Sequence, residues 1–236
     1  MTIIERLVKA DLNKKAAAKT VYDLPDDARL SLSASSDFVG VSFDTPEGKG
    51  ARLKAEGYPC KDRNYIQVKK TYAPHGWGPL LYDIAIELAT KVSYGMISDR
   101  GSISDDAQAV WKYYKTKRTS DVIATPMNIM TCPMNNFMDM FYYWGASEQL
   151  MNPLHTTYHD FSDWISWGHS SEQAARLDIR KMTQNHPDLW KAIVMFVKTS
   201  PFTNSFRWKG PSNLALIKQR ALVSEDFISK YSKIKF

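Results

Sequence analysis

The sequence "YAPHGWGPLLYDIAIELAT", residues Tyr72–Thr90, joins a short glycine-containing turn to a run of apolar residues with helical spacing. The apolar residues recur every three or four positions and would form one buried face: Leu80, Leu81, Ile84, Ala85 and Leu88. Asp83 and Glu87 are expected to point away from that face. Pro79 suits the first turn of a helix, where its missing N–H removes no hydrogen bond. The stretch therefore predicts a helix that begins directly after the glycines.

The turn before this helix has two interpretations. Glycine allows positive φ and a close approach of ligand to backbone, so Gly76 and Gly78 fit a phosphate-binding turn. The N–H groups of Gly76, Gly78 and Leu80 would then point at one anion, and the helix dipole would add positive charge there. A Gly-x-Gly sequence before a helix is also common in ordinary turns. The spacing alone leaves both interpretations open.

The composition is that of a globular protein, with 44% hydrophobic and 24% charged residues in a chain of 236. The net charge of +6 allows an acidic partner such as nucleic acid but does not require one. The amphipathic start at Ile3–Lys19 lacks the apolar region of a signal peptide, and no run is long and apolar enough for a membrane span. Because Cys60 and Cys132 have no metal-like or redox-like spacing, we expect reduced thiols and a cytoplasmic protein.

Alternation of apolar and polar residues predicts strands before the opening stretch. Residues 28–44 alternate on both sides of the turn signal "SSD", which indicates a β-hairpin, and 50–59 is a candidate for a short strand and turn. Asn64–Tyr72 is predicted as a strand that runs into the glycines, with Ile66, Val68, Lys70 and Tyr72 on one face. Residues 91–99 are the next predicted strand. Residues 104–118 are the next predicted helix, with Ser104 as its N-cap.

This order of elements predicts an α/β fold with helices on a mixed central sheet. Beyond Arg118 the chain becomes rich in methionine and aromatic residues, and most of it has helical spacing, apart from a candidate strand at "SFRWKG". We therefore predict two parts, a core at 1–120 and a mostly helical extension at 121–236 that packs on the core.

The segment from about Asn64 to Arg118 resembles the GNAT superfamily of N-acetyltransferases. In that family a strand ends in a Gln/Arg-x-x-Gly-x-Gly/Ala turn, and the following helix receives the pyrophosphate of acetyl-CoA. "APHGWGPLLYDIAIELA" is similar to that segment, with Gly76 and Gly78 as the glycines. "SDRGSISDDAQAVWKYY" lies where the family carries Asn-x-x-Ala-x-x-Leu-Tyr. The resemblance implies a GNAT-like mixed central sheet and acetyl-CoA as a substrate.

Within the superfamily, these two stretches are similar to uncharacterised GNAT-like proteins encoded by bacteriophages. The later stretch "SPFTNSFRWKGPSNL" is more weakly similar to the same group. For a phage protein the resemblance implies the host cytoplasm or the virion as its location. The chain departs from the family pattern at three positions. Ala73 stands where the family often has Gln or Arg, Ser104 replaces the Asn, and Trp111 replaces the tyrosine that protonates the CoA thiolate. An indole cannot supply that proton, so the resemblance supports CoA binding better than it supports the usual chemistry.

The resemblance also implies roles for individual residues. Backbone N–H groups near Lys70–Tyr72 would polarise the thioester carbonyl, and Asp99 would act as the base, although an Asp99–Arg100 pair that fixes a turn is an equally plain interpretation. Tyr72 and Tyr114 are candidate acids, with core tyrosines as the alternative. The residues expected to contact the cofactor are Lys70, Tyr72, His75, Gly76, Trp77, Gly78, Leu80, Ser104 and Trp111.

Two functions follow from these residues. The first is a GNAT-like acyltransferase that moves an acetyl or related group from acyl-CoA to an unknown amine acceptor. The second is a GNAT fold without transfer activity, with a structural or nucleic-acid-associated role in a phage. His155 and His159 are four residues apart and precede Asp160, but no third ligand at a suitable spacing is evident, so no metal is expected.

Overall fold

The computed structural model describes residues 18–60, 63–99, 104–127 and 201–224, together with the single positions 184, 187 and 191. A seven-stranded mixed sheet has the strand order β1-β2-β3-β4-β5-β7-β6. Its strands are β1 (Leu30–Ser35), β2 (Phe38–Asp44), β3 (Gly50–Pro59), β4 (Asn64–Tyr72), β5 (Met96–Ile97), β6 (Val122–Pro126) and β7 (Asn204–Trp208). The helices are η1 (Val21–Asp23), α2 (Gly78–Val92), α3 (Asp105–Thr116), η2 (Pro201–Thr203) and α8 (Asn213–Gln219). The predicted α/β class is confirmed at this level.

Strands β1 to β4 form an antiparallel meander, and β4 is parallel to β5. The predicted hairpin is confirmed, because β1 pairs with β2 across the turn residues Ser36 and Asp37. β3 is a full strand rather than a short strand and turn. β5 is shorter than predicted because α2 continues to Val92, and only Met96 and Ile97 enter the sheet. The parallel β4–β5 pair requires a crossover between the strands, and α2 provides it.

A β-bulge in β4 changes which side chains share a face. The register with β3 shifts between Lys54 and Ala55, so Ala55 pairs with Val68, and Lys54 pairs with Lys70. One residue of β4 is therefore extra, and every side chain after it changes face. The prediction that Lys70 and Tyr72 share a face with Ile66 and Val68 is wrong for this reason.

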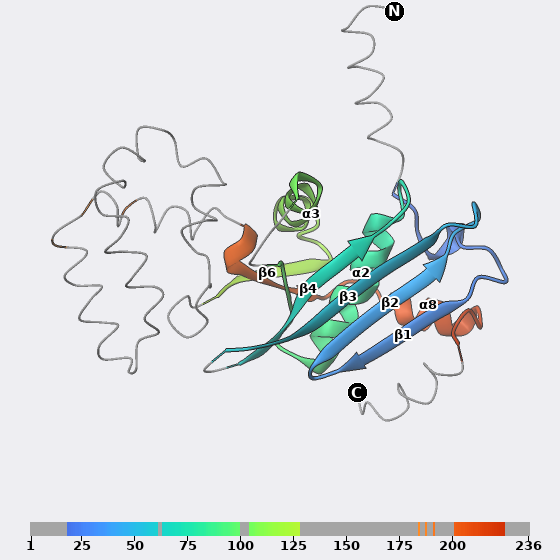
Figure 1. Ribbon diagram of the computed structural model, residues 1–236, viewed down its shortest axis with the longest axis horizontal. Coiled ribbons are helices and arrows are strands. Elements are labelled where there is room, and N and C mark those ends of the chain that lie inside the picture. Colours follow the sequence, from blue (N-terminus) through green and yellow to red (C-terminus); the bar gives the residue numbers. More distant parts are fainter. Residues whose placement is uncertain are drawn as a thin grey trace, which may run out of the picture.

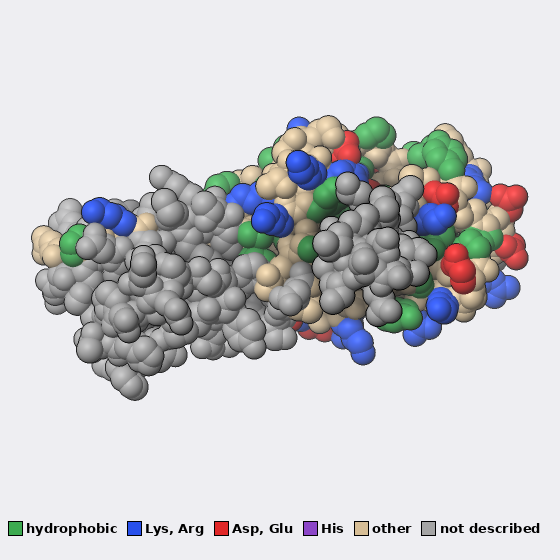
Figure 2. Space-filling model, turned by 90° about the horizontal axis from the view of Figure 1, so that it is seen from above, with side chains coloured by type: hydrophobic (Ala, Val, Ile, Leu, Met, Phe, Trp, Pro, Cys, Tyr) green, Lys and Arg blue, Asp and Glu red, His purple; other side chains and the backbone are tan. Residues whose placement is uncertain are grey.

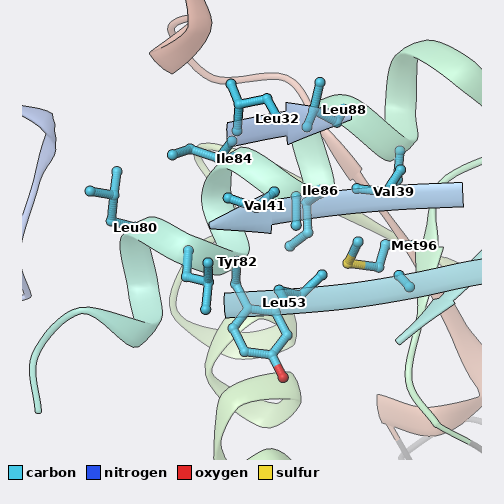
Figure 3. Close-up of a cluster of buried hydrophobic side chains, with 14 of the residues drawn as sticks. Leu32, Val39, Val41, Leu53, Leu80, Tyr82, Ile84, Ile86, Leu88 and Met96 are labelled. Atoms are coloured by element: carbon cyan, nitrogen blue, oxygen red, sulfur yellow. The ribbon is translucent and has the colours of Figure 1, made fainter. Parts of the chain in front are cut away.

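Helix α2 packs on one face of the meander and forms the main core with it (Figure 1; Figure 3). Every residue from Leu80 to Ala89 is buried. The partners from the strands include Leu32, Val39, Val41 and Leu53. Burial of each such side chain contributes about 1.5–3 kcal/mol to the free energy of unfolding, so this layer dominates the stability of the described fold.

Two acidic residues of α2 are buried inside this arrangement. Asp83 and Glu87 are 8% and 2% exposed, which contradicts the expectation that both point away from the buried face. The reason is that α3 and α8 cover the side of α2 that the sequence pattern assigns to solvent. Glu87 accepts hydrogen bonds from the Ser212 hydroxyl at 2.5 Å and the Asn213 N–H at 3.0 Å, and it therefore holds the start of α8 against α2.

Strands β6 and β7 complete the sheet beyond the predicted domain boundary at residue 120. β7 lies between β5 and β6, pairs antiparallel with both, and confirms the candidate strand at "SFRWKG". α8 confirms the helix expected after it. The sheet thus combines residues on both sides of position 120, because β7 returns from the far end of the chain to lie beside β5.

Some sequence-based expectations differ from the structure or fall outside the part that it describes. Cys60 is disulfide-bonded, which contradicts the expectation of reduced thiols; the sequence holds one other cysteine, Cys132, outside the described residues. The amphipathic start at Ile3–Lys19 predicts a helix, of which residues 3–17 also lie outside them, and the described residues 18 and 19 are not helical. His155, His159 and the helices expected between 171 and 200 lie outside them too, apart from the single positions 184, 187 and 191, which are helical. Within the described ranges, no helix has the length and hydropathy needed to span a membrane.

Gly95 should be a sensitive position, because it adopts a φ of +117° where β5 begins beside β7. A Cβ at Gly95 would lie 2.7 Å from the carbonyl oxygen of Phe206. We expect Gly95→Ala to lower the free energy of unfolding by about 2–4 kcal/mol through backbone strain and this clash. Urea denaturation measures the change.

Gly78→Ala is the matched control, because a Cβ there meets no atom within 4 Å and the backbone has no positive φ. We expect it to be neutral or slightly stabilising, by less than about 1 kcal/mol. Equal destabilisation by both substitutions would contradict this account of Gly95.

Candidate functional site

The start of α2 has backbone donors without a hydrogen-bond partner among the described residues. The first bond into the helix runs from the Leu81 N–H to the Trp77 carbonyl at 3.1 Å. The N–H groups of Gly78 and Leu80 have no hydrogen-bond partner among the described residues, and Pro79 between them has no N–H. No side chain caps the helix, and its first turn holds no acidic residue. Two free donors and the positive end of the helix dipole therefore meet at this point.

The turn that precedes α2 is held firmly in place. Gly76 has a φ of +84°, which a residue with a side chain rarely adopts. The Trp77 N–H donates to the Pro74 carbonyl, and the Lys19 N–H donates to the Gly76 carbonyl, both at 3.0 Å. The Trp77 side chain is 1% exposed and meets the Phe43 ring edge-on, with the ring centroids 5.7 Å apart. This anchoring fixes the direction of the free N–H groups.

The same anchoring limits which predicted cofactor residues can touch a ligand through their side chains. Trp77 and Leu80 are buried in the core, so only their backbone atoms are available. Gly78 borders open space, because a Cβ there would have no neighbour within 4 Å. His75 is exposed in the turn. The structure thus brings Gly76, Gly78 and Leu80 together at the helix start, as the sequence predicts.

Strands β4 and β5 stop pairing before β4 ends. Ile66 pairs with Met96 and Gln67 pairs with Ile97, whereas β4 continues to Tyr72. The backbone of Lys69–Tyr72 therefore has no strand partner on the β5 side among the described residues. This unpaired edge leads directly into the turn before α2. An unpaired strand edge can accept an extended chain that carries amide groups.

The bulge points Lys70 and Tyr72 to the face opposite α2. Lys70 lies beside Lys54 and Tyr72 beside Arg52, and all four side chains are on the face that no described helix covers. Thr71, between them, faces α2 and shares a hydrogen bond of 3.2 Å with the Tyr82 hydroxyl. The side chains of Lys70 and Tyr72 are thus separated by the sheet from the side on which α2 packs, although their backbone borders the unpaired edge.

Two polar residues follow β5. The Ser98 hydroxyl is fully buried and has no hydrogen-bond partner. Asp99 is partly buried and has interactions of its own. A buried hydroxyl without a partner destabilises a fold by about 1–3 kcal/mol, so Ser98 is an unsatisfied polar group directly after β5, although its full burial keeps it out of contact with solvent. The sequence singled out Asp99 but not Ser98, since no motif marks a lone serine.

Helix α3 uses its predicted site residues for structure. The Ser104 hydroxyl accepts the Ala107 N–H at 3.3 Å and so caps the helix, as the sequence predicts. Trp111 is 1% exposed and packs between Tyr82 and Phe206, with ring centroids 5.5 and 4.8 Å away. Neither side chain is left free to hold a cofactor.

Tyr114 belongs to a buried polar cluster with Asp83 and Arg118. Its hydroxyl donates to Asp83 Oδ1 at 2.6 Å and also lies 3.1 Å from the Pro79 carbonyl oxygen. Arg118 binds Asp83 Oδ2 at 3.0 Å and Asp121 at 2.8 Å. The Tyr114 hydroxyl is committed to these partners, so the cluster ties α3 to the first turn of α2. The geometry favours the alternative of a core tyrosine over the acid role.

Burial is the main influence on the ionisation of this cluster. It raises the pKa of Asp83, while the Tyr114 hydrogen bond and the charge of Arg118 oppose the rise. Burial also raises the pKa of Tyr114 well above its usual value, with Asp83 adding to the effect. For Arg118, burial lowers the pKa, but Asp83 more than reverses this. The sequence did not predict that Asp83 and Arg118 form a buried cluster with Tyr114. The one local indication was Asp83 itself, a carboxylate within an otherwise apolar helical stretch.

The described residues contain no group of three or more His, Cys, Asp or Glu side chains that could hold a metal ion. Comparison of the chain with protein-family models, curated proteins and solved structures gives no match.

Two adjacent tyrosines test the role of the buried cluster. Tyr114→Phe removes a hydrogen bond to a buried carboxylate, and we expect it to lower the free energy of unfolding by about 1–3 kcal/mol. Tyr113→Phe, on the exposed side of α3, should change it by less than about 0.5 kcal/mol. Chemical denaturation of both variants at neutral pH measures the difference.

The effect should also depend on pH. The Tyr114 hydrogen bond lowers the pKa of Asp83, so its loss raises that pKa further. The penalty in Tyr114→Phe should then be largest when Asp83 is ionised and should shrink as the pH falls below the Asp83 pKa. A penalty that stays constant through acid pH would contradict the assignment.

Proposed function

We propose that the chain binds acyl-CoA at the start of α2 and transfers the acyl group to an amine, as an acyltransferase of the GNAT kind. The observation that carries the proposal is the pair of free N–H groups of Gly78 and Leu80 beside the unpaired end of β4. The order of strand, glycine turn, helix, strand and helix agrees with the resemblance of residues 64–118 to that superfamily.

The helix start fits a pyrophosphate. Free N–H donors and the dipole of a 15-residue helix favour an anion, and no carboxylate in the first turn opposes it. The open space at Gly78 leaves room for phosphate oxygens to approach the backbone. Because Trp77 is locked in the core, the donors are pre-organised and little entropy is lost on binding.

The unpaired edge of β4 fits the pantetheine arm of CoA. That arm is extended and carries two amides, which can pair with strand backbone as an added strand does. An acyl group at its end would then lie along the edge of Lys69–Tyr72, on the side where Ser98 and Asp99 follow β5. A backbone N–H of β4 would polarise the thioester carbonyl.

Acyl transfer needs a base and a stabilised leaving group. The amine nitrogen attacks the thioester carbonyl, the new C–N bond forms, and the C–S bond breaks to release the CoA thiolate. Asp99 is the proposed acceptor of the amine proton, directly or through water. Tyr114 no longer serves as the acid, because its hydroxyl is bound to Asp83. Tyr72 is 57% exposed at the end of β4, but its side chain points to the face opposite α2, so no tyrosine is assigned as the acid.

One observation favours binding without transfer as a second candidate function. Trp111 replaces the family's tyrosine and is buried, and the Tyr114 hydroxyl is bound to Asp83, so neither residue offers a free hydroxyl to the leaving group. A GNAT-like fold that binds CoA but does not transfer its acyl group would have this arrangement. Product formation with a panel of amines would distinguish the two functions once binding is established.

Calorimetric titration with acetyl-CoA tests the proposal. We expect micromolar to sub-millimolar binding that is lost in Gly78→Glu, because a carboxylate at the helix start repels the pyrophosphate and fills the open space. Pantetheine, which lacks the pyrophosphate, should bind at least about tenfold more weakly than CoA.

Gln219→Glu is the matched control, since it adds the same charge at an exposed site on α8. It should bind acetyl-CoA as the wild type does. An absence of binding at millimolar acetyl-CoA, or equal binding by Gly78→Glu and wild type, would overturn the proposal.

A further inference from the structure

We propose that the face of the sheet opposite α2 binds single-stranded nucleic acid. An open hollow of about 720 Å³ lies over β1 to β4 on that face. The described helices α2, α3 and α8 all contribute to the core on the other face. Figure 1 shows the four strands in front, with α2 behind them. The inference does not depend on acyl-CoA binding, because it uses a different face of the sheet.

The hollow is built from two rows of side chains that cross the four strands. The strand register aligns Ser31, Ser42, Arg52 and Tyr72 in one row. The neighbouring row consists of Ser33, Gly40, Lys54 and Lys70. Small residues thus occupy β1 and β2, and long cationic or aromatic residues occupy β3 and β4. The bulge in β4 creates this pattern, because without it Lys70 and Tyr72 would face α2.

The charge of the hollow is one-sided. Its lining includes three cations, Arg52, Lys54 and Lys70, and no carboxylate. Glu56, next along β3, pairs with Lys54 at 2.8 Å, and Asp44 borders the hollow at the end of β2. Arg52 and Lys70 have no ion pair among the described residues. The two therefore present uncompensated positive charge, which complements phosphate groups along a backbone.

The remaining residues suit a nucleotide better than a simple anion. Tyr72 is 57% exposed beside Arg52 and offers a flat face on which a base can stack. The hydroxyls of Ser31, Ser33 and Ser42 can bind sugar or phosphate oxygens. At Gly40 the Phe38 ring and the Ser33 hydroxyl occupy the space that a side chain would take, each 2.8 Å from where a Cβ would lie. An aromatic platform beside cations is the usual combination in single-strand binding.

A single strand fits this surface better than a duplex does. Stacking on Tyr72 requires an unpaired base whose face is exposed, which a duplex does not offer. The hollow is open to solvent, so a strand can continue past it on both sides. On the face drawn in Figure 2, basic side chains are spread over the described surface and acidic side chains lie mostly toward its right-hand end. This charge distribution is compatible with a polyanion that extends beyond the hollow.

Fluorescence anisotropy with a labelled single-stranded 15-mer, as DNA and as RNA, tests the proposal. We expect binding whose log–log salt dependence has a slope of about −1.4, as the two uncompensated cations Arg52 and Lys70 would give on a single strand. Tyr72→Ala should weaken binding by about 5- to 150-fold without changing this slope. The double variant Arg52→Glu/Lys70→Glu should weaken binding by more than about tenfold and reduce the slope.

Matched controls separate this surface from general electrostatics. Lys112→Glu/Lys117→Glu makes the same charge change at two exposed positions, one in α3 and one at its C-cap, and Tyr22→Ala removes a tyrosine that is 71% exposed on η1. Both should bind the 15-mer within about twofold of wild type. An unchanged melting temperature in every variant shows that the fold is intact.

Several outcomes would overturn the proposal. They are an absence of binding at low salt, equal loss of affinity in the control variants, or equal affinity for the 15-mer, its duplex and heparin with no effect of Tyr72→Ala. The Gly78→Glu variant separates this inference from the proposed function. It should lose acetyl-CoA and keep the 15-mer, whereas loss of both would show that one site serves both ligands and would contradict the separate surface proposed here.

Discussion

The rest of the described structure depends on the burial of α2. Ten consecutive residues of this helix, Leu80 to Ala89, are removed from water between the sheet on one side and α3 and α8 on the other. Two of them are acids, and each holds a neighbouring helix: Asp83 binds Tyr114 of α3, and Glu87 binds the start of α8. Breaking one partner from such a buried charge destabilises a fold far more than loss of a surface pair. The position of α2 therefore fixes the helical layer and, with it, the direction of the free N–H groups at its start.

A second constraint is the bulge in β4. It turns the side chains of Lys70 and Tyr72 to the face opposite α2, while the short β5 leaves the backbone edge of Lys69–Tyr72 unpaired. One strand can therefore contribute to two surfaces with different chemistry. The unpaired edge and the start of α2 suit an extended, phosphorylated cofactor, whereas Arg52, Lys70 and Tyr72 suit a polyanion with aromatic bases. If both proposals hold, a nucleic acid and an acyl donor would approach the same strand from opposite faces.

Local chemistry explains which elements could be predicted. Alternation of apolar and polar residues on both sides of a turn predicts the β1–β2 hairpin. The same alternation predicts β4, and both ends of this strand lie where the sequence predicts them. The start of α2 follows from the glycines and Pro79, and the cap of α3 follows from Ser104. Gly76 and Gly78 at the helix start were found for the same reason, since a turn of this kind is specified by a few adjacent residues.

The sequence by itself determined the hairpin, β4, the glycine turn and the helix after it, because a pattern of nearby residues marks each of them. Only the tertiary structure decided the face on which Lys70 and Tyr72 lie, because a bulge is defined by the register with β3. It also decided that Asp83 and Glu87 are buried, since helices from distant parts of the chain cover them. The place of β7 beside β5, and the commitment of the Tyr114 hydroxyl to Asp83, were decided in the same way. In each case the deciding partner is remote in sequence, and no local pattern records it.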